Sequence, residues 1–291
     1  MNSRKTKAVL LMLISALSFS IMQIFVKLSS AEVPTFEQVF FRNLVSLIIA
    51  AFMVKREKLP VVREMRRGGW ALLGRSFFGF LGIVLFFYAT GHARQADVAM
   101  LNRASPVFVT LFAGIFLKEQ INRVKIASTV LCIAGAYIAM QPSFDSNPLP
   151  LFSAFAAAAV AGLAYTLLAY CKNFVSPSVI IFHFSAFSTI CAGVMMLPNF
   201  VVPSPKVFLM LLMIGIFAAG GQFLLTYAYK MAPASEVSIY QYSGVVFTAI
   251  LSFIVLGESL SSSSIVGGLV ILGAIFWVFE YHRKVELPKK T

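Results

Sequence analysis

The sequence predicts an all-α integral membrane protein whose ten transmembrane helices form two inverted five-helix repeats. Hydrophobic residues make up 59% of its 291 residues and charged residues only 12%, whereas soluble domains carry about 25% charged residues. The mean hydropathy is +0.86. The apolar residues form long runs, each near the ~20 residues that cross a bilayer as a helix. One stretch of the chain also recurs 139 positions later, which indicates an internal repeat.

Ten apolar runs are separated by short polar or proline-containing segments, so no appended soluble domain is expected. The first run follows a basic N-terminus, as in a signal peptide. It is long enough to span a bilayer and no small-residue cleavage site follows it, so we expect a retained helix. The predicted spans are 8–28, 36–54, 69–88, 97–117, 124–140, 150–171, 177–197, 207–229, 237–256 and 264–281.

The positive charges are sorted by topology. Eighteen of the twenty-four Lys and Arg residues fall at the N-terminus, in alternate connections or in the C-terminal tail, all on one side of the predicted topology. The positive-inside rule then places both termini in the cytoplasm. The net charge of +13 is therefore a topology signal, and no nucleic-acid partner is expected.

The three cysteines lie inside apolar runs without metal-ligand spacing, so neither a metal nor a cofactor is expected.

The internal repeat pairs residues 97–119 with 236–258 without a gap. From Tyr88 to Tyr137 the 139-residue offset matches ten identical residues in fifty. The repeat divides the chain into residues 1–145 and 146–291, each with five spans. Because five is odd, the second half enters the membrane from the opposite side. Inverted repeats of this kind are typical of secondary transporters that bind substrate near mid-depth, although duplication in a symmetric scaffold of another function is the alternative.

Four segments carry a resemblance to a known family: SPVFVTLFAGIFLKE (105–119), VVFTAILSFIVLGE (245–258), FFRNLVSLIIAA (40–51) and FFYATGHARQADVAML (86–101). Over essentially its whole length the chain resembles the drug/metabolite transporter superfamily, specifically EamA-type proteins with ten helices. The resemblance implies alternating access and export of amino acids or related metabolites through a bacterial inner (plasma) membrane. It also admits nucleotide-linked or lipid-like cargo.

One departure from the family concerns helix geometry. The proline that the family carries in its fourth helix is present as Pro106, but its counterpart in the ninth is Val245. A proline inside a helix removes a backbone donor and bends the helix. We therefore expect a hinge at Pro106 in the first half only.

Arg103 is the main candidate for substrate binding. It lies three residues before Pro106, near the middle of its span, where an arginine is costly unless it faces a cavity or a partner. We expect it to bind an anionic group on a small organic substrate, such as a carboxylate or phosphate. A structural bond to backbone carbonyls or an intramembrane ion pair is the alternative.

Other polar residues could line the same cavity. Arg42 matches a basic residue that the family carries in its second helix, and it can reach the outer half of the cavity. Arg75 is expected to be a structural or gate residue near the cytoplasmic side. The remaining candidates for substrate contact are Asn102 and Gln241, which the repeat pairs with each other, and the tyrosines Tyr242, Tyr165 and Tyr227.

Acidic residues such as Glu119 and Glu236 are expected only at span ends, so no carboxylate proton relay is expected at mid-depth. Facilitated diffusion, exchange or export down a gradient is favoured over proton coupling.

The chain is not expected to be an enzyme, because no catalytic cluster falls at mid-depth, and a channel would need longer polar stripes. A lipid flippase or scramblase remains an alternative. The expected partners are a small-molecule substrate and membrane lipid, with the protein a monomer or a dimer.

Overall fold

The structure is a computed structural model, and it describes residues 3–93, 95–141, 148–257 and 261–285. Within these ranges all regular secondary structure is helical. Ten helical segments are long and apolar enough to cross a membrane, which confirms the predicted fold class. The expected boundary between the two halves, at residues 145–146, lies outside the described residues.

The helices follow the predicted spans closely, with ends that extend a few residues further. The elements are α1 (Ser3–Ser29), α2 (Thr35–Arg56), α3 (Val61–His92), α4 (Gln95–Asn102), α5 (Ser105–Phe116), α6 (Arg123–Met140), α7 (Pro148–Cys171), α8 (Pro177–Met196), η1 (Leu197–Asn199), α9 (Pro205–Met231), α10 (Ala234–Val237), η2 (Ser238–Tyr242), α11 (Ser243–Leu256) and α12 (Ser262–Val285).

The fourth and ninth spans are both interrupted. The fourth consists of α4 and α5, and the ninth consists of α10, the 3₁₀ segment η2 and α11. The expected hinge was a proline-induced one in the first half only, yet both spans are interrupted, the ninth without a proline. In the second half no proline is needed, because the residues of η2 are held by packing: Tyr240 and Tyr242 are fully buried. The Ser243 hydroxyl donates to the carbonyl of Tyr240 (2.7 Å), which ties the 3₁₀ turn to the start of α11.

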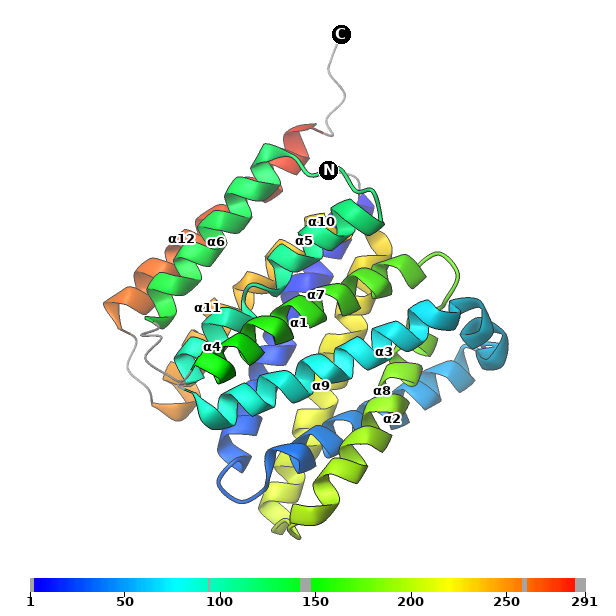
Figure 1. Cartoon of the computed structure of the whole chain (residues 1–291). Helices are drawn as coiled ribbons and strands as arrows, with labels where there is room; N and C mark the ends of the chain where they lie inside the picture. Colours follow the sequence, from blue (N-terminus) through cyan, green and yellow to red (C-terminus); the bar gives the residue numbers. More distant parts are fainter. Residues whose placement is uncertain (1–2, 94, 142–147, 258–260, 286–291) are drawn as a thin grey trace.

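The packing between helices comes in matched sets, as expected for two halves related by a twofold axis. Helix α1 packs closely on α9, and the equivalent pair is α7 on α3. Helix α1 also contacts α11, as α7 contacts α5, while α2–α8 and α6–α12 each pair an element with its own counterpart. In Figure 1 the α6–α12 pair lies along one edge of the bundle and the α2–α8 pair along the opposite edge. The six remaining spans of the two halves lie between these edges.

Glycines permit the closest approaches. A Cβ on Gly135 would lie 2.8 Å from the carbonyl oxygen of Gly267, so α6 and α12 pack backbone against backbone. Gly69 has a different role. It interrupts α3 with φ 44° and ψ −130°, a backbone conformation that favours glycine, and it separates the first turns of α3 from the span predicted to begin at residue 69.

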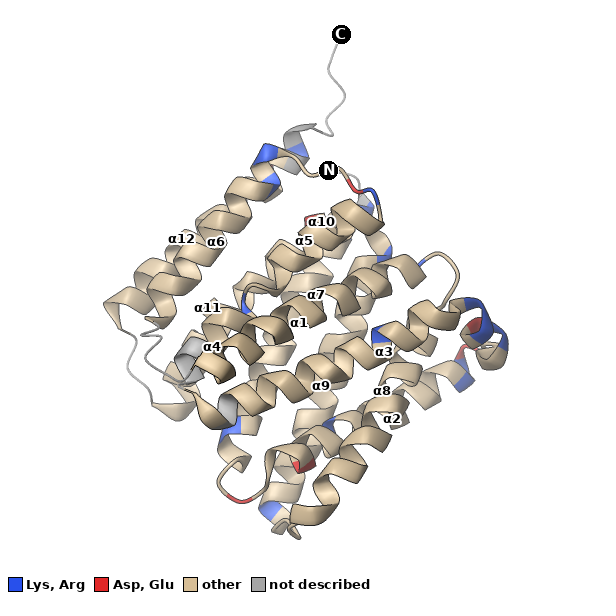
Figure 2. Ribbon diagram, in the orientation of Figure 1, with Lys and Arg blue, Asp and Glu red and all other residues tan. Residues whose placement is uncertain are grey.

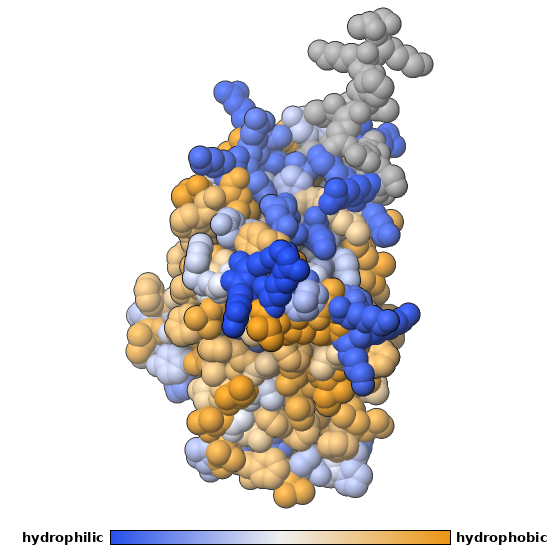
Figure 3. All heavy atoms as spheres, turned by 90° about the vertical axis from the view of Figure 1, so that its right-hand side faces the viewer, coloured by the Kyte–Doolittle hydropathy of each residue, from blue (hydrophilic) through white to orange (hydrophobic). Residues whose placement is uncertain are grey.

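The outer surface is apolar where lipid would contact it. Large side chains such as Trp70, Phe152 and Leu269 are more than half exposed. Lys and Arg residues gather at the end of the bundle where α1 begins and α12 ends, which we call the basic face (Figure 2). Figure 3 shows the same division, with hydrophilic residues over the upper half and hydrophobic ones below. An apolar belt with charges concentrated at one end is what a bilayer requires.

Candidate functional site

Arg103 lies at the break in the fourth span, between the end of α4 and the start of α5. Its Nη1 atom comes within 3.5 Å of the place that a Cβ on Gly244 of α11 would occupy, and Ser20 of α1 lies beside the same glycine. The side chain therefore points across the interface between the two halves. Part of it stays accessible, and no ion pair joins it to a carboxylate among the described residues.

The site around Arg103 contains polar groups without partners. Tyr242 of η2 lies close enough to interact electrostatically with Arg103. Its side chain is 0% exposed, and its hydroxyl has no hydrogen-bond partner among the described residues, which also holds for the hydroxyl of Ser105. Buried polar groups are usually hydrogen-bonded, so unsatisfied ones beside a cation indicate a place where a ligand could bind.

A cluster of hydrogen bonds lies beside this site. The Ser20 hydroxyl donates to the carbonyls of Ala16 (2.9 Å) and Gly244 (3.2 Å), and it accepts from the hydroxyl of Thr248 (3.0 Å). These bonds tie α1 of the first half to α11 of the second. They also hold the Gly244 backbone, against which the Arg103 guanidinium rests.

A second cluster surrounds Arg75 of α3. Arg75 is 2% exposed, and its guanidinium carbon lies 4.3 Å from the ring centroid of Phe184 and 5.7 Å from that of Tyr165. Gly79 makes room for it, because a Cβ there would overlap Nη1 of Arg75. Arg42 of α2 lies within electrostatic range of both Arg75 and Tyr165.

This cluster carries charge that its own residues do not balance. The Nε atoms of Arg42 and Arg75 are buried without a hydrogen-bond partner in the described part of the chain. Desolvating an ion costs several kcal/mol in a protein interior, whereas a desolvated cation–π contact contributes about 2 kcal/mol. Arg75, which was expected to be a structural or gate residue, lies in the interior with the candidate residues Arg42 and Tyr165.

A wall of neutral side chains links the two clusters. The rings of Tyr165 and Tyr229 stack with centroids 5.8 Å apart, and Gln241 donates to the Tyr229 hydroxyl through Nε2 (2.9 Å). Gln241 precedes Tyr242 in η2, so the backbone of η2 connects this group of side chains to the neighbour of Arg103. Asn102, the repeat partner of Gln241, ends α4 and makes no side-chain hydrogen bond within the described ranges.

Tyr227 does not belong to this wall. It hydrogen-bonds Ser178, which in turn donates to Glu57 (2.9 Å) where α2 ends and α8 begins. The neighbouring tyrosine, Tyr229, takes the place expected for Tyr227. Residues two apart on a helix point to opposite sides, so the sequence identified α9 as a source of an aromatic wall residue but not which tyrosine faced inward.

Pro106 begins a helix rather than bending one. It is the second residue of α5, where its missing N–H costs little and its fixed φ suits the first turn. Backbone bonds close the turn before it, from the Arg103 N–H to the carbonyls of Ala99 (3.2 Å) and Met100 (3.0 Å). The expected hinge at Pro106 is thus a break between two helices at the residue that carries the candidate cation.

Carboxylates of the first half bridge to the second half at both ends of the bundle. On the basic face, Glu64 accepts from the Ser176 N–H and hydroxyl (both 2.7 Å), and Glu119 accepts from the N–H groups of Ala234 (2.8 Å) and Ser235 (2.9 Å). Here Glu119 acts as a helix cap for α10, in agreement with its predicted place at a span end. At the other end, Glu37 accepts from the Val201 N–H (3.1 Å).

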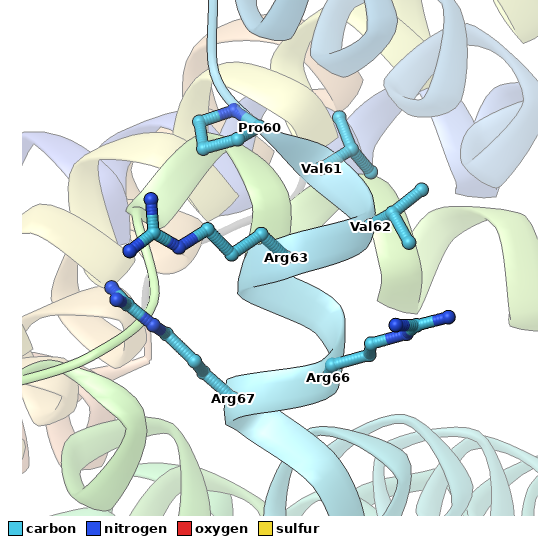
Figure 4. A pocket seen from close by; sticks show the side chains of 6 residues that line it. All are labelled: Pro60, Val61, Val62, Arg63, Arg66 and Arg67. Atoms are coloured by element: carbon cyan, nitrogen blue, oxygen red, sulfur yellow. The ribbon is translucent and has the colours of Figure 1, made fainter.

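Two further features lie outside the site. His183 is hydrogen-bonded through Nδ1 to the Ser76 hydroxyl (2.7 Å), as a packing histidine would be. An open surface hollow of about 670 Å³ lies on the first turns of α3, away from the buried arginines (Figure 4). The hollow is lined by Pro60, Val61, Val62, Arg63, Arg66 and Arg67.

Among the described residues, no group of three His, Cys, Asp or Glu side chains is placed to hold a metal ion.

The chain is similar in sequence to known transporters over most of its length. The chain is 31% identical over 268 residues to the pseudopaline exporter CntI of Pseudomonas aeruginosa strain UCBPP-PA14, covering 91% of this chain and 93% of the exporter. It is 25% identical over 283 residues to an S-adenosylmethionine uptake transporter of Rickettsia bellii, covering 96% and 94% of the two chains. It is 24% identical over 254 residues to a riboflavin transporter of Brucella anthropi, covering 84% and 88%.

A solved crystal structure shares the fold with a TM-score of 0.84 at 15% identity, covering 97% of this chain and 99% of the other. The model of the EamA-like transporter family matches twice, over residues 6–141 and 149–280. The matches cover both halves of the chain, and these relatives carry the names of transporters, not enzymes. The protein therefore belongs to the EamA-like transporter family, within the drug/metabolite transporters that the sequence resembles.

Proposed function

We propose that the protein is a secondary transporter that exports a small organic metabolite with an anionic group by alternating access between its two halves. Arg103 carries the proposal, because it is a cation at mid-span without a carboxylate partner among the described residues. It lies at the interface between the halves, where inverted-repeat transporters bind substrate. Amino acids and organic acids are the substrate classes that fit first.

The closed ends of the bundle support the alternating-access part of the proposal. Glu64 and Glu119 bridge the halves at the basic face, and Glu37 does so at the opposite face. Opening either side would break the hydrogen bonds of that side and leave the other side intact. The two halves, residues 1–145 and 146–291, would act as the moving units. We place the basic face, and with it both termini, in the cytoplasm of a cell with an inner (plasma) membrane.

The relatives support transport of a small molecule without identifying it, and the exporter among them supports the proposed direction. The first is named an exporter and others are named for riboflavin transport and S-adenosylmethionine uptake. These names span different chemistries, so the substrate has to come from the site itself. An arginine at mid-depth favours a carboxylate or phosphate, because the guanidinium offers a planar pair of donors to either group.

The test is a thermal-shift screen of the purified protein against amino acids, organic acids and nucleotides, followed by transport of each hit in proteoliposomes. Arg103→Ala should lower transport roughly 10–150-fold, the effect of losing a hydrogen bond to a charged group. Arg67→Ala removes an exposed arginine from the surface hollow and serves as the matched control.

Normal transport by a correctly inserted Arg103→Ala protein would contradict the assignment of substrate binding to Arg103. Movement of labelled phospholipid in the same liposomes, with no transport of any soluble compound, would instead favour a lipid flippase or scramblase.

A further inference from the structure

Arg42 and Arg75 form a pair of cations that the proposed site at Arg103 does not use. They come from α2 and α3; Arg75 lies over the ring of Tyr165 of α7, and Arg42 lies within electrostatic range of the same tyrosine. Arg75 is 2% exposed and is enclosed by Phe184, Tyr165 and the close backbone of Gly79. Such enclosure fixes the guanidinium in one place, which suits recognition of a ligand group better than a mobile surface arginine would.

The pair lacks a counter-charge. Both Nε atoms are buried without a hydrogen-bond partner, and within the described residues neither arginine forms an ion pair. Arg42 and Arg75 repel one another because they are like charges within electrostatic range. Their aromatic neighbours are neutral and satisfy only part of what two guanidinium groups require. An anion from outside the chain would supply the missing charge and accept the free N–H groups.

The pair and Arg103 are connected through a chain of packed residues. Arg75 contacts Tyr165, Tyr165 stacks on Tyr229, and Gln241 hydrogen-bonds Tyr229. The residue after Gln241 is Tyr242, the neighbour of Arg103. A ligand that bridged the two clusters would therefore meet cations at two separated points.

We propose that Arg42, Arg75 and Tyr165 form a second anion subsite and that the transported metabolite carries at least two acidic groups, one for this subsite and one for Arg103. The proposal rests on the proposed transport function at Arg103. A carboxylate or a phosphate would fit the guanidinium pair, since both accept two N–H donors in one plane. A free inorganic anion could supply the same chemistry, and the experiment separates the two sources.

The experiment measures thermal unfolding of the purified protein with butyrate, glutarate, citrate or inorganic phosphate as probes. Arg75→Gln, Arg103→Gln and the control Arg67→Gln are compared with the unmodified protein. We expect glutarate or citrate to bind the unmodified protein at least 10-fold more tightly than butyrate does. Arg75→Gln should abolish this preference, and Arg103→Gln should weaken binding of every organic acid.

A measurement on the ligand-free protein distinguishes a ligand-binding role of Arg75 from a purely structural one. If its charge is uncompensated, Arg75→Gln should raise the Tm of the ligand-free protein by roughly 2 °C or more, because removing an unpaired buried charge relieves desolvation and repulsion. A fall in Tm would mean that the arginine is satisfied by its surroundings, which would overturn the proposal.

Three other outcomes would overturn the proposal. Equal binding of butyrate and glutarate, both lost in Arg103→Gln, would overturn the second subsite and leave the transport site at Arg103 intact. A shift with phosphate alone, lost in Arg75→Gln and kept in Arg103→Gln, would show a resident inorganic anion and overturn the two-acid substrate. The absence of any shift with glutarate and citrate would also overturn it.

Discussion

The fourth and ninth spans have equivalent places in the two halves, and both are interrupted within one residue of the repeat offset. Helix α5 begins at residue 105 and α11 at residue 243, and subtracting the offset of 139 puts the second start at position 104. Their chemistry differs at the break. The first half places the partly accessible Arg103 there, and the second half places the fully buried Tyr242. One half thus supplies a charge and the other a closed neutral wall.

The difference shows how a duplicated fold can produce an asymmetric site. The backbone break is common to both halves, so either could have presented a polar side chain at mid-depth. In the first half that side chain is a partly accessible cation, whereas in the second half it is a fully buried tyrosine. A ligand would therefore be held from one side by charge and from the other by shape and by the Gln241–Tyr229 bond.

The most severe way to break this asymmetry is Tyr242→Arg, which places a second cation in the closed wall. Tyr242 is 0% exposed and already faces Arg103, so the new charge would be buried and unpaired. We expect a loss of about 3–5 kcal/mol in stability, measured as thermal unfolding in detergent. Tyr242→Phe removes only a hydroxyl without a partner, so it should leave the Tm nearly unchanged. An unaltered Tm for Tyr242→Arg would mean that both breaks are open and that the halves are alike.

A moderate effect is expected from Gln241→Leu compared with its repeat partner change, Asn102→Leu. Gln241 satisfies the hydroxyl of the fully buried Tyr229, and losing it leaves that hydroxyl unpaired, a cost of about 1–3 kcal/mol. The Asn102 side chain makes no hydrogen bond within the described ranges, so Asn102→Leu should stay within ~0.5 kcal/mol. Unfolding of both variants, with Tyr229→Phe added as a double-mutant cycle, measures the difference. Equal losses in the two variants would refute the unequal roles.

The smallest effect is expected from Pro106→Val, which gives the first half the residue type of the second. The ninth span is interrupted without proline, so packing rather than the pyrrolidine ring should maintain the break. We expect transport within about twofold of normal and a stability loss below ~1 kcal/mol, the usual worth of a proline in a compatible place. A large fall in transport with a normal Tm would show that the proline itself sets the geometry at Arg103.

The sequence alone determined the features that follow from local and compositional physics. Hydrophobic runs of bilayer length identified ten spans, and sorted Lys and Arg predicted the basic face. The repeat offset alone predicted that Arg103 and Tyr242 occupy equivalent positions in the two halves. Such patterns are readable because the bilayer imposes one length and one polarity on every span.

Only the tertiary structure decided which polar side chains meet. Arg75 joined Arg42 and Tyr165 in the interior, and Tyr229 replaced Tyr227 as the wall residue. The sequence also did not predict the 3₁₀ break of the ninth span, because this break has no proline and depends on the burial of Tyr240 and Tyr242. These features arise from contacts between helices far apart in the chain, and small shifts in helix rotation determine them. Within an almost wholly apolar span, the sequence carries little information about that rotation.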